Sequence, residues 1–407
     1  MHKSEIKIGI IAERKNPPDK RVAFTPAQCL KIQAEFPGVK ILVEPSPMRC
    51  IADSEYEELG ILLVDDLSSA DILFGIKEVP IEALIPGKTY FFFSHTIKKQ
   101  AHNRRLLQEL LSRKIEMVDY ECLLDEKGGR TVAFGRFAGI VGAYNSLRIW
   151  LKRNLNIDLK NASDCSDMAE MLNCGRPFVE KMGNVRIAVT GTGRVGLGAV
   201  EVLENLGIKR VQPAEFLSTE FNEPVFTVLS SRHYLRHEDN KPWNEAEFRT
   251  SPSKFISGFM EFAKRTDILI PCHYWNPAAP ALFTKEDIAQ AEFKISVISD
   301  VTCDIEGSIP TTLRASTIKV PFYDISRQDC QEQAPFSNPE NISICAVDNL
   351  PCELPLDASK AFGEMLMQHV IPELVSENRP GIEGATITKN GQLCPNFSYL
   401  KTFSEES

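Results

Sequence analysis

The sequence predicts an α/β protein built from two doubly wound parallel-sheet domains. Its 407 residues exceed what a single hydrophobic core usually supports. Short apolar runs alternate with helical patterns in both halves of the chain, and a glycine-rich turn follows an apolar run at Gly191. The 43% hydrophobic and 25% charged residues are ordinary values for a globular protein. We therefore expect two cores with a cleft between them.

The first region carries the alternation most clearly. A helix over Pro26–Phe36 is predicted because Thr25 is a good N-cap and Pro26 suits the first helical position. The other predicted elements are strands at Lys7–Ala12, Val39–Val43, Ile72–Gly75, Thr89–Phe93 and Glu116–Asp119, and a helix at Lys99–Arg113. This βα rhythm favours a parallel sheet covered by helices on both faces.

A second series of strands begins at Val185. The predicted elements beyond the first region are a long helix at Ala138–Lys152, a polar connector at Asn156–Asn184 with one short helix, strands at Arg186–Val189, Arg265–Pro271 and Ile295–Asp300, an insertion at Ser218–Thr250, and a long helix at Leu356–Leu374 that returns to the first domain. The predicted domains are residues 1–150 with 350–407, and residues 151–349.

Charge and cysteine usage exclude several classes of protein. The net charge of −9, from 46 basic and 55 acidic residues, disfavours nucleic-acid and anionic-membrane binding. No apolar run approaches the roughly 18–20 residues of a membrane span. The 11 cysteines are scattered without a Cys-x-x-Cys pair, so we expect reduced thiols, no metal site and a cytoplasmic location. The expected partner is a small-molecule substrate; the oligomeric state is left open.

The strongest local signal is a dinucleotide turn. An apolar strand from Val185 runs into Gly191-Thr192-Gly193-Arg194-Val195-Gly196, and an amphipathic helix follows to Leu206. Gly191 permits the tight turn, Gly193 lets the backbone approach a pyrophosphate, and Gly196 lets helix and strand pack closely. The helix N-terminus offers N–H donors to phosphates. A purely structural glycine turn is the alternative.

The nicotinamide cofactor is expected to be NAD, with NADP possible. Glu215 lies about twenty residues after the last glycine, where a carboxylate binds the ribose hydroxyls of NAD. An ordinary surface acid is the alternative interpretation. Lys209 and Arg210 lie close by and would instead suit the 2′-phosphate of NADP. The two sheets are therefore expected to be Rossmann-like.

Polar side chains gather at the carboxyl ends of the predicted strands in the first region, where open α/β sheets bind ligands. They are Arg21, Lys77, His95, Lys98, Glu121 and Arg130. Several cations suit a substrate with several carboxylates, and a histidine or a lysine among cations suits proton transfer. Singly, each is more simply explained as a solvated charge, and His95 as a core histidine.

Several motifs resemble those of lysine-forming saccharopine dehydrogenase, and equally the lysine–ketoglutarate reductase domain of bifunctional lysine-degrading enzymes, within the alanine dehydrogenase and transhydrogenase superfamily. The motifs are Arg21-Val-Ala-Phe-Thr-Pro, Gly75-Ile-Lys-Glu-Val-Pro, Phe93-Ser-His-Thr-Ile-Lys-Lys-Gln, Val132-Ala-Phe-Gly-Arg-Phe-Ala-Gly, Cys272-His-Tyr-Trp-Asn-Pro and Asp348-Asn-Leu-Pro-Cys-Glu-Leu-Pro. The resemblance covers nearly the whole chain.

The resemblance implies a reversible oxidation of saccharopine by NAD and water to L-lysine, 2-oxoglutarate and NADH. It implies that Lys77 and His95 are an acid–base pair whose charge is tuned by Lys98. The residues expected to bind or border the substrate are Arg21, Lys98, Glu121, Arg130, Phe134 and Asp348, and Cys272 joins the turn residues and Glu215 at the cofactor. Saccharopine carries three carboxylates, which gives the cations a purpose.

Three alternatives remain at this point. One is an alanine-type or other opine amino-acid dehydrogenase, and another is the NADP-dependent reductase direction. The third is a nucleotide-binding regulatory protein without catalysis, against which Lys77 and His95 argue. The length of Ser218–Thr250 and of Asn156–Asn184 departs from the family pattern and leaves the substrate open.

Overall fold

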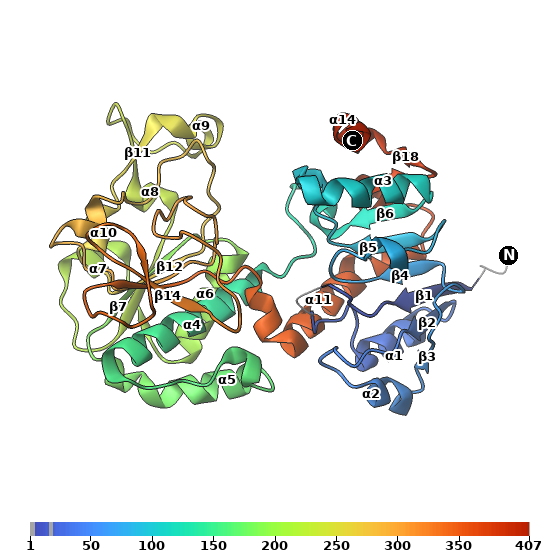
Figure 1. The fold of residues 1–407 in the computed structure, drawn as a ribbon, viewed down its shortest axis with the longest axis horizontal. Coiled ribbons are helices and arrows are strands. Elements are labelled where there is room, and N and C mark those ends of the chain that lie inside the picture. Colours follow the sequence, from blue (N-terminus) through green and yellow to red (C-terminus); the bar gives the residue numbers. More distant parts are fainter. Residues whose placement is uncertain (1–4, 16–18, 407) are drawn as a thin grey trace. The chain divides into compact units, whose positions relative to one another are not determined.

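The computed structural model describes residues 5–15 and 19–406, and these divide into two compact units (Figure 1). The first unit contains the described parts of 1–134 and 355–407, and the second contains 135–354. Each unit holds an eight-stranded, mostly parallel sheet with helices, so the predicted fold class is confirmed. Among the described helices, none is long and apolar enough to cross a membrane.

The sheet of the first unit has the order β18-β17-β6-β5-β4-β1-β2-β3. Its strands are β1 (Ile6–Ile10), β2 (Val39–Val43), β3 (Leu62–Leu63), β4 (Ile72–Phe74), β5 (Thr89–Phe92), β6 (Glu116–Asp119), β17 (Thr386–Lys389) and β18 (Gln392–Leu393). The strands from β3 to β6 are parallel to their neighbours, whereas β17 is antiparallel to β6. From β1 the chain adds β2 and β3 on one side, and then returns to add β4 on the other side of β1. The strands β1 and β4 therefore flank a topological switch point.

The helices of the first unit are α1 (Pro26–Glu35), α2 (Asp53–Glu58), α3 (Arg104–Ser112), α11 (Pro355–His369), α12 (Ile371–Leu374), α13 (Pro380–Ala385) and α14 (Lys401–Glu405). The predicted N-cap of α1 is confirmed: Thr25 and Gln28 form a capping box. Gln28 also donates to the Lys360 carbonyl of α11 at 2.7 Å. The segment before Arg104 forms two short 3₁₀ turns, so the helix predicted from Lys99 begins later.

The sheet of the second unit has the order β15-β14-β16-β13-β12-β7-β9-β8, and β10 pairs separately with β11. Its strands are β7 (Arg186–Thr190), β8 (Lys209–Arg210), β9 (Val225–Leu229), β10 (Leu235–His237), β11 (Phe255–Ser257), β12 (Ile268–Pro271), β13 (Val297–Ser299), β14 (Phe322–Ile325), β15 (Glu332–Gln333) and β16 (Ile342–Cys345). Its helices are α4 (Gly135–Leu155), α5 (Met168–Gly175), α6 (Arg194–Asn205), α7 (Pro213–Ser218), α8 (Ser231–Tyr234), α9 (Glu245–Thr250) and α10 (Met260–Ala263).

The structure corrects two interpretations of the sequence. The segment 218–250 is not simply an insertion, because its apolar run Val225–Leu229 is β9, an inner strand paired with both β7 and β8. Residues 135–150, which the sequence assigned to the first domain, lie in α4 and group with the second unit. Residues Gly139 to Leu151 of α4 are all buried, so this helix packs on more than one side.

Glycines allow α4 and α6 to pack closely. A methyl group at Gly139 would clash with the Val195 carbonyl oxygen, and one at Gly198 would clash with the Arg136 carbonyl oxygen. The Arg136 guanidinium also donates to both carboxylate oxygens of Glu201, at 2.7 and 2.5 Å. The beginning of α6, next to the glycine turn, is therefore supported by backbone contact with α4.

We predict that Gly139→Ala lowers the free energy of unfolding by about 2–3 kcal/mol or more, because the obstructing atom is backbone and cannot rotate away. The matched control is Gly384→Ala in α13, where a methyl group meets no atom within 4 Å. The free energy of unfolding of this control should rise by about 0.5–1 kcal/mol, because alanine favours a helix more than glycine does. Urea unfolding measures both variants, and equal stability of Gly139→Ala and wild type would contradict the close packing.

Candidate functional site

His95 and Glu78 form the centre of a charged cluster at the sheet edge of the first unit. Glu78 follows β4 and His95 follows β5, and the His95 Nδ1 atom is in contact with a carboxylate oxygen of Glu78. Lys15 donates to the other carboxylate oxygen at 2.8 Å. Burial raises the pKa of Glu78, but the bonds from His95 and Lys15 prevail and lower it to about 2. Glu78 is thus a fixed negative charge against the imidazole.

His95 has a left-handed backbone, with φ of 54° and ψ of 8°. Such a conformation is uncommon for a residue other than glycine and costs free energy, and it recurs at functional sites. The ring is half-buried and lies near Phe93, with 6.4 Å between ring centroids. The left-handed backbone therefore makes His95 a candidate functional residue.

Lys77 is anchored by a carboxylate that the sequence analysis did not select. Glu13, just beyond β1, accepts the Ile76 N–H at 2.6 Å and the Lys77 N–H at 3.0 Å. Burial, followed by repulsion from Asp19, raises the pKa of Glu13 to about 7. These residues lie where β1 and β4 leave the sheet, at the topological switch point, which is the place where such sheets bind ligands.

Glu121 joins Lys98 and Arg130 just beyond β6. Its Oε1 atom lies 3.4 Å from the Lys98 ammonium and 3.2 Å from the Arg130 guanidinium. The Glu121 side chain is only 6% exposed, and its Oε2 atom has no hydrogen-bond partner among the described residues. An unpaired buried carboxylate oxygen costs free energy, which the contacts of Oε1 with Lys98 and Arg130 partly offset.

Asp119 holds the exits of β5 and β6 together. Its carboxylate accepts the Ser94 N–H at 3.0 Å and the Glu121 N–H at 2.8 Å, and the Ser94 hydroxyl donates to it as well. Burial raises the pKa of this carboxyl. Because Ser94 precedes His95, Asp119 fixes His95 and Glu121 relative to each other.

Arg21 does not present the open cation that the sequence analysis expected. Its side chain is 2% exposed and donates to both oxygens of Asp19, at 3.0 and 2.6 Å. The guanidinium lies 4.1 Å from the centroid of the Phe134 ring, and Phe134 stacks on Phe362 at 4.4 Å. Arg21 is therefore paired with Asp19 and packed on Phe134, and its expected contact with a substrate carboxylate stays a prediction.

The glycine turn of the second unit has the geometry of a phosphate-binding loop. Gly191 has a φ of 96°, and a methyl group there would lie 2.7 Å from the Cys272 carbonyl oxygen. A methyl group at Gly196 would clash with the Gly191 carbonyl oxygen, whereas none would meet an atom within 4 Å at Gly193. The exposed residues 192–194 lead into the twelve-residue helix α6. The turn thus fits a dinucleotide pyrophosphate, with open space where the backbone must approach it.

Cys272 and His273 support this turn from β12. Cys272 is 7% exposed, and burial raises the pKa of its thiol. His273 shares a hydrogen bond of 2.7 Å with the Thr190 hydroxyl, and burial lowers its pKa to about 4. Cys272 therefore packs beneath the turn. Asp348, which the sequence analysis placed at the substrate, is exposed beyond the end of β16.

Glu215 is not beside the turn in the way that its sequence spacing suggested. It is exposed in α7, after β8, and β9 separates β8 from β7. Two strand spacings, roughly 10 Å, therefore separate β8 from the strand that carries the turn. The neighbouring strand is β9, which ends at Leu229 and continues into Ser230, Ser231 and Arg232.

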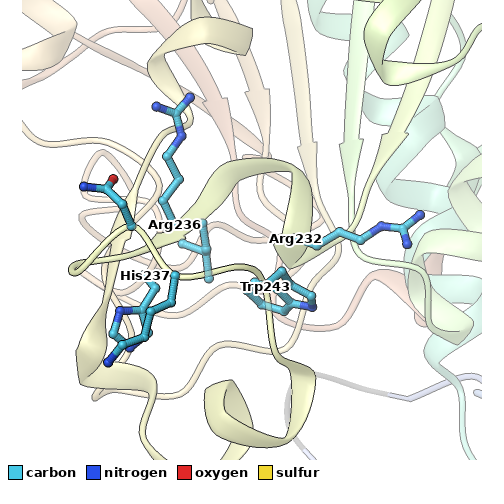
Figure 2. Close-up of a pocket in the computed structure, with 7 residues that line it drawn as sticks. Arg232, Arg236, His237 and Trp243 are labelled. Carbon is cyan, nitrogen blue, oxygen red and sulfur yellow. The ribbon is translucent and has the colours of Figure 1, made fainter.

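A basic pocket of about 220 Å³ follows β9 (Figure 2). Its lining includes Arg232, Arg236, Lys241 and Trp243. Arg236 is paired with Glu261 and Lys241 with Asp239, whereas Arg232 forms no ion pair with any residue in 5–15 or 19–406. Figure 2 shows the Arg232 side chain extending away from Arg236 and His237. The sequence analysis missed this residue because it interpreted Ser218–Thr250, which contains Arg232, as an insertion.

Residues 9–141 match the family model of the alanine dehydrogenase/PNT N-terminal domain. The matched segment contains Glu13, Lys77, Glu78, His95 and Glu121, so the charged cluster lies inside it.

The full chain has curated relatives and solved structural neighbours. Mouse mitochondrial alpha-aminoadipic semialdehyde synthase is 31% identical over 90% of this chain, but the chain spans only 45% of that relative. Saccharopine dehydrogenase [NAD(+), L-lysine-forming] of Yarrowia lipolytica is 26% identical over 90% of this chain and 92% of its own length. The structure of an L-alanine dehydrogenase has a TM-score of 0.66 at 16% identity, covering 98% and 99% of the two chains. The resemblance expected from the motifs is confirmed.

We predict that replacing Glu13 changes the pH dependence of stability. The unfolded carboxyl loses its proton near pH 4.5, whereas the folded one keeps it to about pH 7, so the folded state is penalised as pH rises between these values. The free energy of unfolding of Glu13→Gln, relative to that of wild type, should therefore rise by up to about 3 kcal/mol between pH 5 and pH 8. Urea unfolding at several pH values tests this, with Glu58→Gln on α2 as the control. Parallel stability profiles for wild type and Glu13→Gln would contradict the buried acid.

Proposed function

We propose that this chain is a nicotinamide-dependent amino-acid dehydrogenase that interconverts saccharopine and water with L-lysine and 2-oxoglutarate. One observation carries the proposal. Lys77, the Glu78–His95 pair and the Glu121–Lys98–Arg130 group leave adjacent strands at one sheet edge, inside a domain of the alanine dehydrogenase/PNT family. The names of the relatives that match over nearly their full length support the same reaction.

His95 and Lys77 are the proposed proton-transfer groups. Oxidation of a secondary amine, attack by water and collapse to amine and keto acid each require a proton to move, and the bound nicotinamide supplies the acceptor for hydride. Glu78 orients the His95 ring through Nδ1, which leaves Nε2 to face the substrate. Glu13 fixes the Lys77 backbone, so the ammonium is presented from a rigid strand end.

Substrate binding is assigned to the Glu121 group. A movement of the Glu121 side chain that exposes its Oε2 atom would let this oxygen accept from an amine of the substrate, which satisfies the oxygen left without a partner. The Lys98 and Arg130 side chains are 47% and 50% exposed and can pair with substrate carboxylates while Glu121 keeps them in place. Phe134, held by Arg21, supplies an apolar wall.

The cofactor is assigned to the turn at residues 191–196, and the structure favours NADP over NAD. The expectation of NAD depended on Glu215, which is not on the strand next to β7. The strand that is next to β7 leads into Ser230, Ser231 and Arg232, without a carboxylate to repel a 2′-phosphate. Several relatives are named as NAD(+) enzymes, so a direct comparison of activity with the two cofactors tests this assignment.

An alanine-type dehydrogenase is the second candidate, because the fold is shared with L-alanine dehydrogenase. Oxidation of NADH and NADPH with 2-oxoglutarate plus lysine, compared with pyruvate plus ammonia, separates the two reactions. Turnover only with pyruvate plus ammonia would overturn the proposed reaction. Nucleotide binding without turnover on either pair would favour the regulatory interpretation.

We predict that Lys77→Met and His95→Gln each reduce turnover by about 10²-fold or more, the usual contribution of a general acid or base. The matched controls are Lys31→Met and His102→Gln, which change exposed side chains of the same unit. Steady-state rates with saturating substrates provide the measurement. Turnover within twofold of wild type for both site variants would remove the proposed roles.

We predict that Arg232→Ala raises the KM for NADPH at least 10-fold and leaves the KM for NADH nearly unchanged, because only NADPH carries the 2′-phosphate. Arg236→Ala is the control, since this neighbouring arginine is already paired with Glu261. If the KM for NADPH does not change in Arg232→Ala, the assignment of this side chain is wrong.

A further inference from the structure

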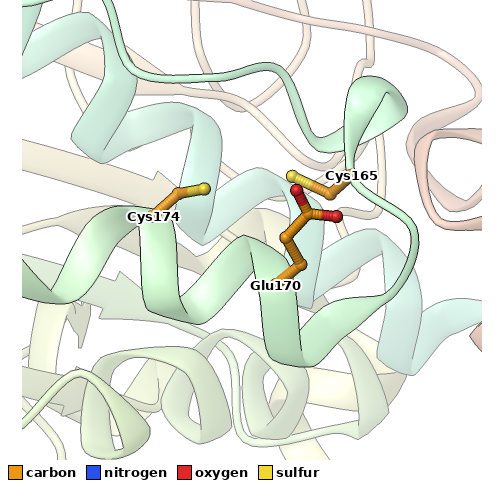
Figure 3. A group of neighbouring side chains, drawn as sticks. All are labelled: Cys165, Glu170 and Cys174. Atoms are coloured by element: carbon orange, nitrogen blue, oxygen red, sulfur yellow. The ribbon is translucent and has the colours of Figure 1, made fainter.

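Two thiols and a carboxylate meet at the connector before the dinucleotide strand (Figure 3). Cys165 follows the 3₁₀ turn Ala162–Asp164, and Glu170 and Cys174 lie one helical turn apart on the same side of α5. One ligand atom from each residue lies within 4.8 Å of the others. Cys165 is buried and the other two are half-buried. The spacing escaped the sequence analysis because no Cys-x-x-Cys pair marks it.

Hydrogen bonds hold the Cys165 and Glu170 side chains in this arrangement, and α5 carries Cys174. Asp167 caps α5 by accepting the Glu170 N–H at 2.8 Å. The Ser166 N–H donates to the Glu170 carboxylate at 2.7 Å, and the Lys160 ammonium pairs with the same group. The Cys165 thiol donates to the Asn161 carbonyl at 3.4 Å. The donor set is therefore arranged in advance, with carboxylate contacts of the kind that orient metal ligands.

We propose that Cys165, Glu170 and Cys174 form a Zn²⁺ site. Two sulfur atoms and one carboxylate oxygen are ligands that Zn²⁺ accepts in a tetrahedron, with water at the fourth position. Binding releases the two thiol protons. The charges of the ion, two thiolates, one carboxylate and the Lys160 ammonium then sum to zero, so the site needs no further counterion.

The place of this site indicates a structural role. Gly175, at the end of α5, lies beside Leu206 at the far end of α6, about 18 Å along that helix from the dinucleotide turn. The Tyr144 hydroxyl of α4 donates to the Lys160 carbonyl at 2.8 Å. A bound ion would therefore connect α5 to the polar segment that lies against α4, away from the turn.

Metal analysis of the full chain tests the proposal. The protein is stripped with a chelator under reducing conditions and dialysed against Zn²⁺, and its zinc content and thermal unfolding are measured. We expect one Zn²⁺ per chain and a higher Tm, both retained in Cys394→Ser. Cys165→Ser and Cys174→Ser should each weaken binding at least 10-fold, and Glu170→Gln should weaken it less.

A second measurement needs no variant. Zn²⁺ should protect Cys165 and Cys174 from alkylation in the wild-type protein, as peptide mass spectrometry reports, while Cys394 reacts equally with and without the ion. Co²⁺ in place of Zn²⁺ should show a thiolate charge-transfer band. No bound zinc, zinc retained in the double cysteine variant, or alkylation of Cys165 and Cys174 that Zn²⁺ does not slow would each overturn the site. A Cys165–Cys174 disulfide in the protein isolated without reductant would overturn it as well.

Discussion

Parallel pairing of β1, β4, β5 and β6 is the constraint on which the chemistry of the first unit depends. Parallel strands all end at the same edge of a sheet, so residues far apart in sequence become neighbours there. Glu13, Lys77, His95 and Glu121 each follow one of these strands directly. Without this pairing, nothing in the sequence would bring these residues close together.

Carboxylates organise the cations at this edge. Glu78 contacts both Lys15 and His95, Glu121 contacts Lys98 and Arg130, and Asp19 pairs with Arg21. Each acid keeps its cation in one place and lowers the local excess of positive charge. Two groups in this arrangement cost folding free energy. The Oε2 atom of Glu121 is buried without a partner among the described residues, and Glu13 is buried with a raised pKa. Such uncompensated groups are characteristic of sites that bind a ligand.

In the second unit, glycines serve both close packing and the proposed approach of backbone to a phosphate. Close contact between α4 and α6 requires Gly139 and Gly198, and the turn itself requires Gly191 and Gly196. Four positions without a side chain thus let two helices and a strand approach one another, while Gly193 is left with open space. Packing and binding are served by the same residue type for different physical reasons.

The sequence by itself determined the fold class, most strands of the first unit, the capped start of α1 and the glycine turn, because these depend on local periodicity, capping and backbone freedom. Tertiary structure alone decided that β9 lies beside β7, and this order places Arg232, rather than Glu215, after the neighbouring strand. It also paired Arg21 with Asp19 and brought Cys165 to Cys174. Strand order and side-chain pairing are set by burial of surfaces that are distant in sequence, and spacing along the chain carries little information about them.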